Sequence, residues 1–292
     1  MTRIAALTHV REDAFFTDIW IRHYSGLVGR ENLHIMLDGT DWTPTVDLSG
    51  ISTSIMTGFK GDQNKDDRRV MKFEDRMVEK LLETYDYVIR TDADELVMPD
   101  PGTNLTIADV ARESDEFGTR YVSGLDLVQN MTCEGPLTDT QPILSQRRYG
   151  VISKWYMKPM IFSRLLPLNQ GSHIARGVPP IVSENIFMFH LTAVDKALTE
   201  KRYAWRHGIN DDFQKHQVHH FAKFDAIEQC ENLMDMDEAF RYARVEFQDR
   251  NGRIGNRPQN FSDRTANGKI WINGEDRNVY LVEIPKRFEG FL

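Results

Sequence analysis

Two periodicities alternate along the first hundred residues. Short apolar runs such as IAALTHV predict buried strands, whereas apolar side chains at helical spacing predict amphipathic helices. Strands are expected over residues 4–10, 33–37, 52–56 and 85–90, and helices over residues 11–28 and 66–83. Strands that alternate with helices predict a mostly parallel sheet covered by helices, which is an α/β fold.

The pattern changes after the first hundred residues. Strand-like stretches follow at residues 121–128, 155–163 and 185–190. From Val194 onward the spacing is helical, most clearly over residues 226–247. The last forty residues are rich in Asn, Gly, Arg and Asp and predict irregular surface chain. We therefore expect one domain over residues 1–193 and a helical C-terminal extension packed on it over residues 194–292.

Charge and cysteine content exclude several classes of protein. The 292 residues hold 36 Lys and Arg against 44 Asp and Glu, a net charge of −8, so we expect no nucleic-acid partner. The apolar runs are shorter than the ~18–20 residues of a membrane-spanning helix. Cys133 and Cys230 lie far apart in the sequence, and no signal-peptide pattern opens the chain. We expect a cytoplasmic location.

The densest group of charged residues is Asp92-Ala93-Asp94-Glu95, which directly follows an apolar strand. Such closely spaced carboxylates repel one another unless a cation or hydrogen bonds compensate, and divalent Mg²⁺ or Mn²⁺ accepts oxygen ligands. The alternative is a solvated acidic turn at the strand end. Arg11 and Asp38 also follow strands, and ligands of open α/β sheets bind at that edge.

The order of these motifs resembles family-2-like glycosyltransferases of the GT-A fold. The resemblance is carried by HVRED at residues 9–13, IMLD at residues 35–38 and YVIRTDADE at residues 87–95, the last similar to the D-x-D-E element of one subgroup. It covers residues 3–100 well and continues more loosely through residues 158–159, 171–173 and 187–190. It implies a Rossmann-like, mostly parallel sheet in three α/β/α layers.

The resemblance also implies a hexosyltransferase that takes its sugar from a UDP- or GDP-sugar. Asp92 and Asp94 would then hold Mn²⁺ or Mg²⁺, with His190 completing the metal shell. The residues expected near the nucleotide sugar are Arg11, Asp38, Asp92, Lys158 and His173. For Lys158, His173 and His190, an ordinary structural role is the alternative.

Inverting transfer, the more frequent mode of the family, needs a general base, usually a carboxylate. Asp126, after a predicted sheet strand, is the first candidate and Glu184 the second, and an ordinary surface acid is the alternative for both. The acceptor is expected to be a glycan, a glycolipid or another hydroxyl compound, as in polysaccharide biosynthesis. Residues 226–247 carry many acids, which oppose anionic lipid, so membrane contact would be peripheral at most, at the inner face.

Other functions remain open at this point. A nucleotidyltransferase acting on a sugar phosphate shares the layered α/β logic, but residues 7–13 lack the glycines of a phosphate loop. A phosphatase with an aspartyl nucleophile would carry its motif nearer the chain start. A non-catalytic module that binds carbohydrate or a protein partner on the same fold is the non-enzymatic alternative.

Overall fold

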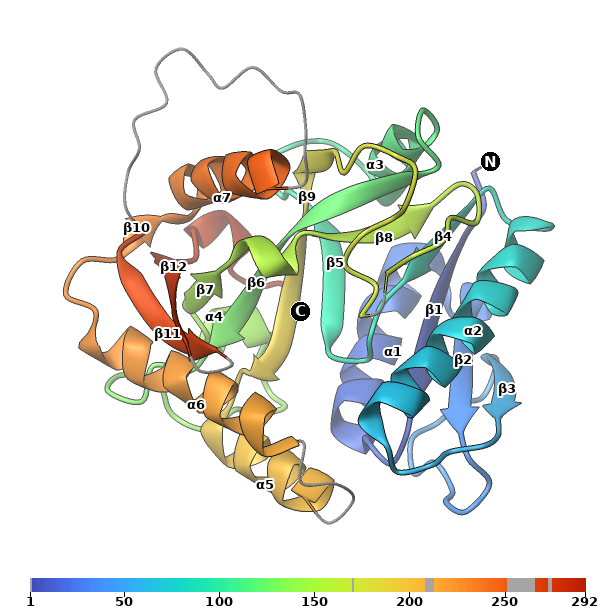
Figure 1. Ribbon diagram of the computed structural model, residues 1–292, viewed down its shortest axis with the longest axis horizontal. Helices are drawn as coiled ribbons and strands as arrows, with labels where there is room; N and C mark the ends of the chain where they lie inside the picture. Colours follow the sequence, from blue (N-terminus) through green and yellow to red (C-terminus); the bar gives the residue numbers. More distant parts are fainter. Residues whose placement is uncertain (1, 170, 208–212, 251–265, 273–274) are drawn as a thin grey trace. The chain divides into compact units, whose positions relative to one another are not determined.

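The computed structural model describes residues 2–169, 171–207, 213–250, 266–272 and 275–292. The chain forms two compact units (Figure 1). Unit 1 comprises Met1–Val122 and Lys158–Met188, and unit 2 comprises Ser123–Met157 and Phe189–Leu292. The expected domain boundary between residues 193 and 194 stays a prediction.

Unit 1 contains the alternating strands and helices of the N-terminal half. Its strands are β1 (Ile4–Val10), β2 (Leu33–Asp38), β3 (Ser52–Met56), β4 (Tyr87–Arg90), β5 (Glu95–Pro99) and β8 (Lys158–Phe162). Its helices are α1 (Ala14–Val28), α2 (Gln63–Leu82) and the short α3 (Ile107–Ala111). Strands β6 (Thr119–Val128) and β9 (Val182–Ala193) each begin in unit 1 and end in unit 2.

The sheet of unit 1 is parallel over four strands, in the order β4-β1-β2-β3, and β8 pairs antiparallel with β4. The chain runs outward from β1 to β3 and returns through α2 to β4, on the other side of β1 (Figure 1). Right-handed crossovers therefore put α1 and α2 on opposite faces. The predicted α/β fold with a Rossmann-like parallel sheet is confirmed.

The return of the chain also marks where a ligand would bind. Strands β1 and β4 are neighbours whose following connections run in opposite directions. In open α/β sheets, the crevice at the carboxyl ends of two such strands is the usual ligand site. Arg11 follows β1 and Asp92 follows β4 by two residues, so both belong to this edge.

Unit 2 is built on an antiparallel sheet. Its elements are α4 (Ile143–Gln146), β7 (Tyr149–Ile152), α5 (Lys196–His207), α6 (Phe213–Gln229), β10 (Met234–Asp235), α7 (Met236–Arg250), β11 (Gly268–Ile272) and β12 (Glu275–Glu283). Strand β7 lies between β6 and β12 and is antiparallel to both. The apolar core joins this sheet to α6 through Val128, Val151, Phe224, Ile227, Val279 and Leu281.

Two expectations for the C-terminal part are wrong. The helical run expected over residues 226–247 is interrupted, because α6 ends at Gln229 and α7 begins at Met236, where Asp235 accepts a hydrogen bond from the Glu238 amide (2.9 Å). The irregular surface chain expected over the last forty residues contains β12, whose Tyr280 pairs with Ile152 of β7. The apolar run that ends this strand is buried.

Candidate active site

Arg11 and Asp38 meet at the carboxyl edge of the parallel sheet. Arg11 Nη1 donates to the Asp38 carbonyl oxygen (2.7 Å), and Nη2 pairs with Asp41 Oδ2 (2.6 Å). The hydrogen bond to Asp41 is the main cause that raises the pKa of Arg11. The guanidinium carbon also lies 4.2 Å from the centre of the Phe59 ring. These contacts hold Arg11 in place beside Asp38, and the roles expected of both residues at the nucleotide stay predictions.

The Asp38 side chain offers an unused acceptor. It is buried, and its Oδ2 pairs with Arg69 Nη2 of α2 at 2.7 Å. Its Oδ1 is buried and has no hydrogen-bond partner among the described residues. A buried acceptor without a donor is costly, so this oxygen suits a ligand hydroxyl or amine.

A hollow of about 300 Å³ lies at the same ends of β1 and β2. It is lined by residues from both strand ends, from α1 and from the following loop: Val10, Glu12, Asp13, Ala14, Thr17, Leu37, Trp42, Thr43, Pro44, Thr45, Val46 and Leu48. Trp42 Nε1 donates to the Asp38 carbonyl (2.8 Å), which ties the loop to the site. The volume falls at the lower end of small-ligand pockets, about 300–1,000 Å³.

The first turn after β1 carries two acids, Glu12 and Asp13, in different local structures. Glu12 has a φ of 52°, a left-handed backbone that non-glycine residues rarely adopt and that recurs at functional sites. Asp13 caps α1, since its Oδ1 accepts from the Phe16 amide at 3.4 Å. Both acids line the hollow.

Two aromatic side chains of α1 hold the acidic segment that follows β4 in place. Trp20 Nε1 donates to Thr91 Oγ1 (2.9 Å), and the Tyr24 hydroxyl donates to the Glu95 carbonyl (3.1 Å). Both aromatic side chains are fully buried. The helical spacing of α1 therefore fixes the backbone on either side of Asp92 and Asp94.

The acids of this segment differ in exposure and in partner. The Asp92 side chain is 50% exposed, whereas Asp94 and Glu95 are buried. Lys158, at the start of β8, forms an ion pair with Glu95. Burial alone would lower the pKa of Lys158, but Glu95, with smaller contributions from Asp92 and Asp94, raises it above its usual value. Lys158 thus contacts the acidic segment through Glu95, and the role expected of it beside the nucleotide sugar stays a prediction.

His9, Glu74 and Asp92 form a further group that can offer ligand atoms to a metal ion. One atom from each lies within 4.8 Å of the others, and His9 Nδ1 is 2.9 Å from Glu74 Oε1. Burial lowers the pKa of His9, but the Glu74 hydrogen bond and charge outweigh it and raise the pKa to about 9. Glu74 also pairs with Arg90. A cation bound by these three side chains would take the place of the His9 proton.

The turn that contains His173 is tethered to this network. Arg90 Nη2 donates to Ser172 Oγ (3.0 Å), and Arg90 is in turn paired with Glu74 and Asp75. The turn belongs to unit 1, as does Glu184, which is exposed on β9. The roles expected of His173 and Glu184 stay predictions.

Asp126 and His190 form a closed polar cluster in unit 2. His190 Nδ1 lies 2.5 Å from Asp126 Oδ1, and His190 Nε2 lies 2.7 Å from Thr192 Oγ1. Asp126 Oδ2 is 2.6 Å from Lys223 Nζ, and both side chains are fully buried. Burial would raise the pKa of Asp126, but Lys223 and His190 lower it. A buried, neutralised carboxylate is a poor base for an acceptor hydroxyl, and the roles expected of Asp126 and His190 stay predictions.

Several residues around the acidic segment of unit 1 and around Asp126 in unit 2 could not be singled out from the sequence. Glu74 and Arg69 are two among the many charged residues of a polar helix, and only the packing of α2 shows that they turn toward the sheet. Lys223 is a buried lysine on a helix of low amphipathicity. Trp42 could have been suspected, because an aromatic residue in a turn-rich stretch between two strands has no core to fill.

The comparisons with known proteins give little further. No model of a protein family matches the chain, and no curated protein sequence does. Among solved structures it is similar to a mannosyltransferase, PcManGT from Pyrobaculum calidifontis in complex with GDP-Man and Mn²⁺. The identity is 13% and the TM-score 0.33, over 88% of this chain and 76% of that one. A TM-score this low supports no conclusion about this chain. A function for it must therefore be inferred from its own residues.

The length and polarity of the helices bear on membrane insertion. Within the described parts of the chain, no helix combines the length and the apolar character needed to cross a bilayer.

Proposed function

We propose that the chain is a metal-dependent glycosyltransferase that uses a nucleotide-sugar donor. The observation that carries the proposal lies within unit 1. The acidic segment Asp92–Glu95, the unpaired Asp38 oxygen and a hollow of about 300 Å³ all belong to the carboxyl edge of one parallel sheet. A nucleoside diphosphate suits each of these features. Its diphosphate can share a metal ion with the acidic segment, one of its hydroxyls or amines can donate to Asp38, and its nucleoside can fill the hollow.

The residues of unit 1 divide the donor between them. The hollow beside Trp42 takes the nucleoside, and Asp38 Oδ1 accepts from one of its hydroxyls or amines. Asp92, half-exposed, and Asp94 provide the carboxylates for Mn²⁺ or Mg²⁺. The ion, when bound, supplies Lewis-acid stabilisation of the leaving diphosphate. Arg11, fixed by Asp41, contributes positive charge beside the nucleotide.

The acceptor side of the proposal follows from the same chemistry. A glycan, glycolipid or other hydroxyl acceptor must lose a proton as the glycosidic bond forms, so a carboxylate base is required for inversion. Glu184 is exposed and therefore open to an acceptor, whereas Asp126 is sealed by Lys223 and His190. We therefore place Glu184 ahead of Asp126 as the base.

One observation favours a second candidate function. Lys158 neutralises Glu95, and Arg90 neutralises Glu74, so these buried acids are compensated without an added ion. A chain that uses Asp92–Glu95 only as an acidic turn would be a non-catalytic carbohydrate-binding module on this fold.

Titration calorimetry with UDP, GDP and CDP, each with Mn²⁺ or with EDTA, tests the proposal. We expect one nucleotide to bind with Mn²⁺ and about tenfold or more weaker with EDTA, since an ion bridging carboxylate and diphosphate adds charge-assisted contacts to both. Asp92→Asn should give the same loss in the presence of Mn²⁺. Asp18→Asn is the matched control, because the Asp18 side chain is exposed to a similar degree, 55% against 50%, on the outside of α1.

Turnover distinguishes the two candidate functions. Hydrolysis of the matching nucleotide sugar, lost in Asp92→Asn and kept in Asp18→Asn, would establish the enzyme. Absence of binding by all three nucleotides at millimolar concentrations would overturn the donor site and leave the carbohydrate-binding module.

A further inference from the structure

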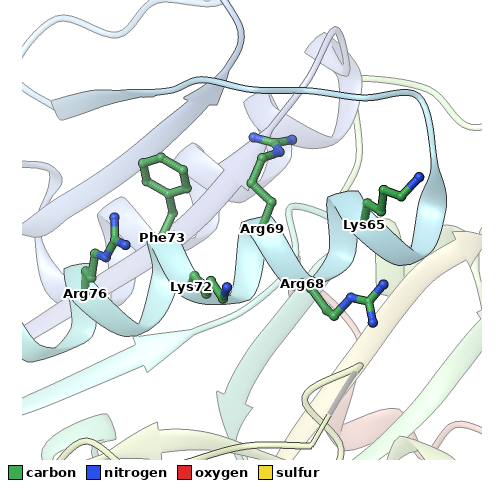
Figure 2. A pocket seen from close by; sticks show the side chains of 6 residues that line it. All are labelled: Lys65, Arg68, Arg69, Lys72, Phe73 and Arg76. Carbon is green, nitrogen blue, oxygen red and sulfur yellow. The ribbon is translucent and has the colours of Figure 1, made fainter.

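One face of α2 carries a row of cations around a shallow hollow. The hollow measures about 310 Å³, and all of its lining side chains come from this helix (Figure 2). They are Lys65, Arg68, Arg69, Lys72, Phe73 and Arg76. Lys65, Arg68, Lys72 and Arg76 are exposed, and the last three follow one another at intervals of four residues, so they share one stripe of the helix.

The cations of the hollow fall into two groups by their partners. Arg69 turns toward the sheet and pairs with Asp38 and Asp66, and Lys65 pairs with Asp62 at 3.0 Å. Arg68, Lys72 and Arg76 form no ion pair with any residue that the structure describes. The charges of these three side chains are therefore not held in ion pairs within the described chain.

This arrangement is unfavourable for the helix itself. Like charges four residues apart destabilise a helix by about 0.2–0.5 kcal/mol per pair. The chain as a whole carries a net charge of −8, so the cluster does not follow from a generally basic surface. An external anion would remove these costs.

The spacing indicates the shape of that anion. From Arg68 to Arg76 the helix rises by about 12 Å, so the cations repeat at about 6 Å. An elongated chain with repeated negative charges fits this row better than a single phosphate. Phe73 adds an apolar surface in the same hollow, with the Arg76 guanidinium carbon 5.6 Å from its ring centre. Sugar rings present apolar faces that pack on such an aromatic side chain.

Two other anionic partners fit less well. Insertion into a membrane uses exposed apolar residues beside the cations, and none of the large exposed apolar residues found in the described chain lies on α2. Nucleic-acid binding proteins carry a broad basic surface, which this acidic chain lacks.

We propose that the basic face of α2, formed by Arg68, Lys72 and Arg76 around Phe73, binds an acidic glycan. This inference rests on the proposed function, for which the glycan is the acceptor, and it makes that acceptor an anionic polymer. The face and the candidate donor site share α2, since Arg69 of the same helix binds Asp38.

Binding of a heparin-derived octasaccharide in EDTA tests this inference. Maltooctaose serves as the neutral glycan of equal length, and an eight-nucleotide single strand of thymidylate serves as the non-glycan polyanion. We expect the acidic glycan to bind best. Lys72→Gln should weaken it about two- to fivefold, the range of one exposed charge contact. Arg68→Gln/Lys72→Gln/Arg76→Gln should weaken it about tenfold or more.

Lys80→Gln is the matched control for Lys72→Gln. Lys80 is an exposed lysine of the same helix outside the hollow, so the change in net charge is identical. Equal weakening by the two variants would overturn the site, because attraction would then follow net charge alone. Equal binding of maltooctaose, or tighter binding of the oligonucleotide, would overturn the acidic glycan as the ligand.

The two proposals fail in different ways. The glycan assay contains EDTA and no nucleotide, so it does not depend on the donor site. The triple variant should keep the metal-dependent nucleotide binding of the unaltered chain, because none of its three residues contacts Asp38 or Asp92. Loss of both activities, with unchanged circular dichroism, would contradict a glycan site separate from the donor site.

Discussion

Lys223→Met is the sharpest test of the polar cluster in unit 2. The Lys223 ammonium lies 2.6 Å from Asp126 Oδ2, and both side chains are 0% exposed. The ammonium also bonds to the Tyr156 hydroxyl (3.0 Å) and to His220 Nδ1 (2.8 Å). Methionine keeps the shape of the side chain and removes its charge. The substitution therefore leaves a buried carboxylate with His190 as its remaining hydrogen-bond partner.

The size of the effect follows from that geometry. Removing one partner of a buried ion pair costs about 3–5 kcal/mol. His190 bonds to Asp126 and can carry a proton, so we expect the lower end, about 3 kcal/mol. Asp126→Asn in the Lys223→Met background removes the stranded charge and should recover most of this loss, because replacing both charged groups of a buried pair is often neutral.

Urea unfolding followed by circular dichroism measures both variants. The double variant serves as the control for the single one. It has more substitutions, yet we expect it to lose less free energy of unfolding. A cost below about 1 kcal/mol for Lys223→Met, the range of an exposed pair, would refute the reasoning. So would a double variant less stable than the single one. The small cost would mean that water reaches Asp126, which would then return as a candidate general base.

Three further outcomes are expected from the structure. The pKa of His9 is raised to about 9 from 6.5, so in EDTA its contribution to stability is complete below pH 6.5 and is lost as the pH rises through 9, a decline that His9→Gln should remove from unfolding midpoints. Trp20→Phe deletes the hydrogen bond to the buried Thr91 hydroxyl and should cost about 1–2 kcal/mol in urea unfolding. Gly150→Ala directs a methyl group into Leu125 and should cost about 1–3 kcal/mol, seen as a lower melting temperature.

Much of the fold of unit 1 could be predicted because its elements are defined locally. The buried run of β1 and the helical spacing of α1 are each contained in one segment. The C-terminal part could not be predicted in the same way. Strand β12 ends in a recognisable apolar run, but its partner β7 lies more than a hundred residues earlier. The average composition of the last forty residues gave no indication of this nine-residue strand.

The candidate site could be predicted only where a residue follows a strand. Arg11, Asp38 and Asp92 were singled out in this way, since strand ends are visible in the sequence, and the structure places all three at the expected edge while their roles stay predictions. Their partners come from elements packed on the sheet, and no spacing rule links Arg69 to Asp38 or Lys158 to Glu95. Sequence patterns thus locate the edge of the sheet, whereas tertiary packing decides which charges there are already neutralised.

That neutralisation determines how a metal ion would bind. Glu95 is paired with Lys158 and Glu74 with Arg90, which leaves the half-exposed Asp92 as the carboxylate of this group most open to solvent. Mg²⁺ and similar hard cations need several oxygen ligands and usually take some from phosphate and water. Under the proposed function, the protein would therefore supply only part of a coordination shell at this edge, and the donor diphosphate would supply the rest. Ion and nucleotide should each bind weakly alone and tightly together.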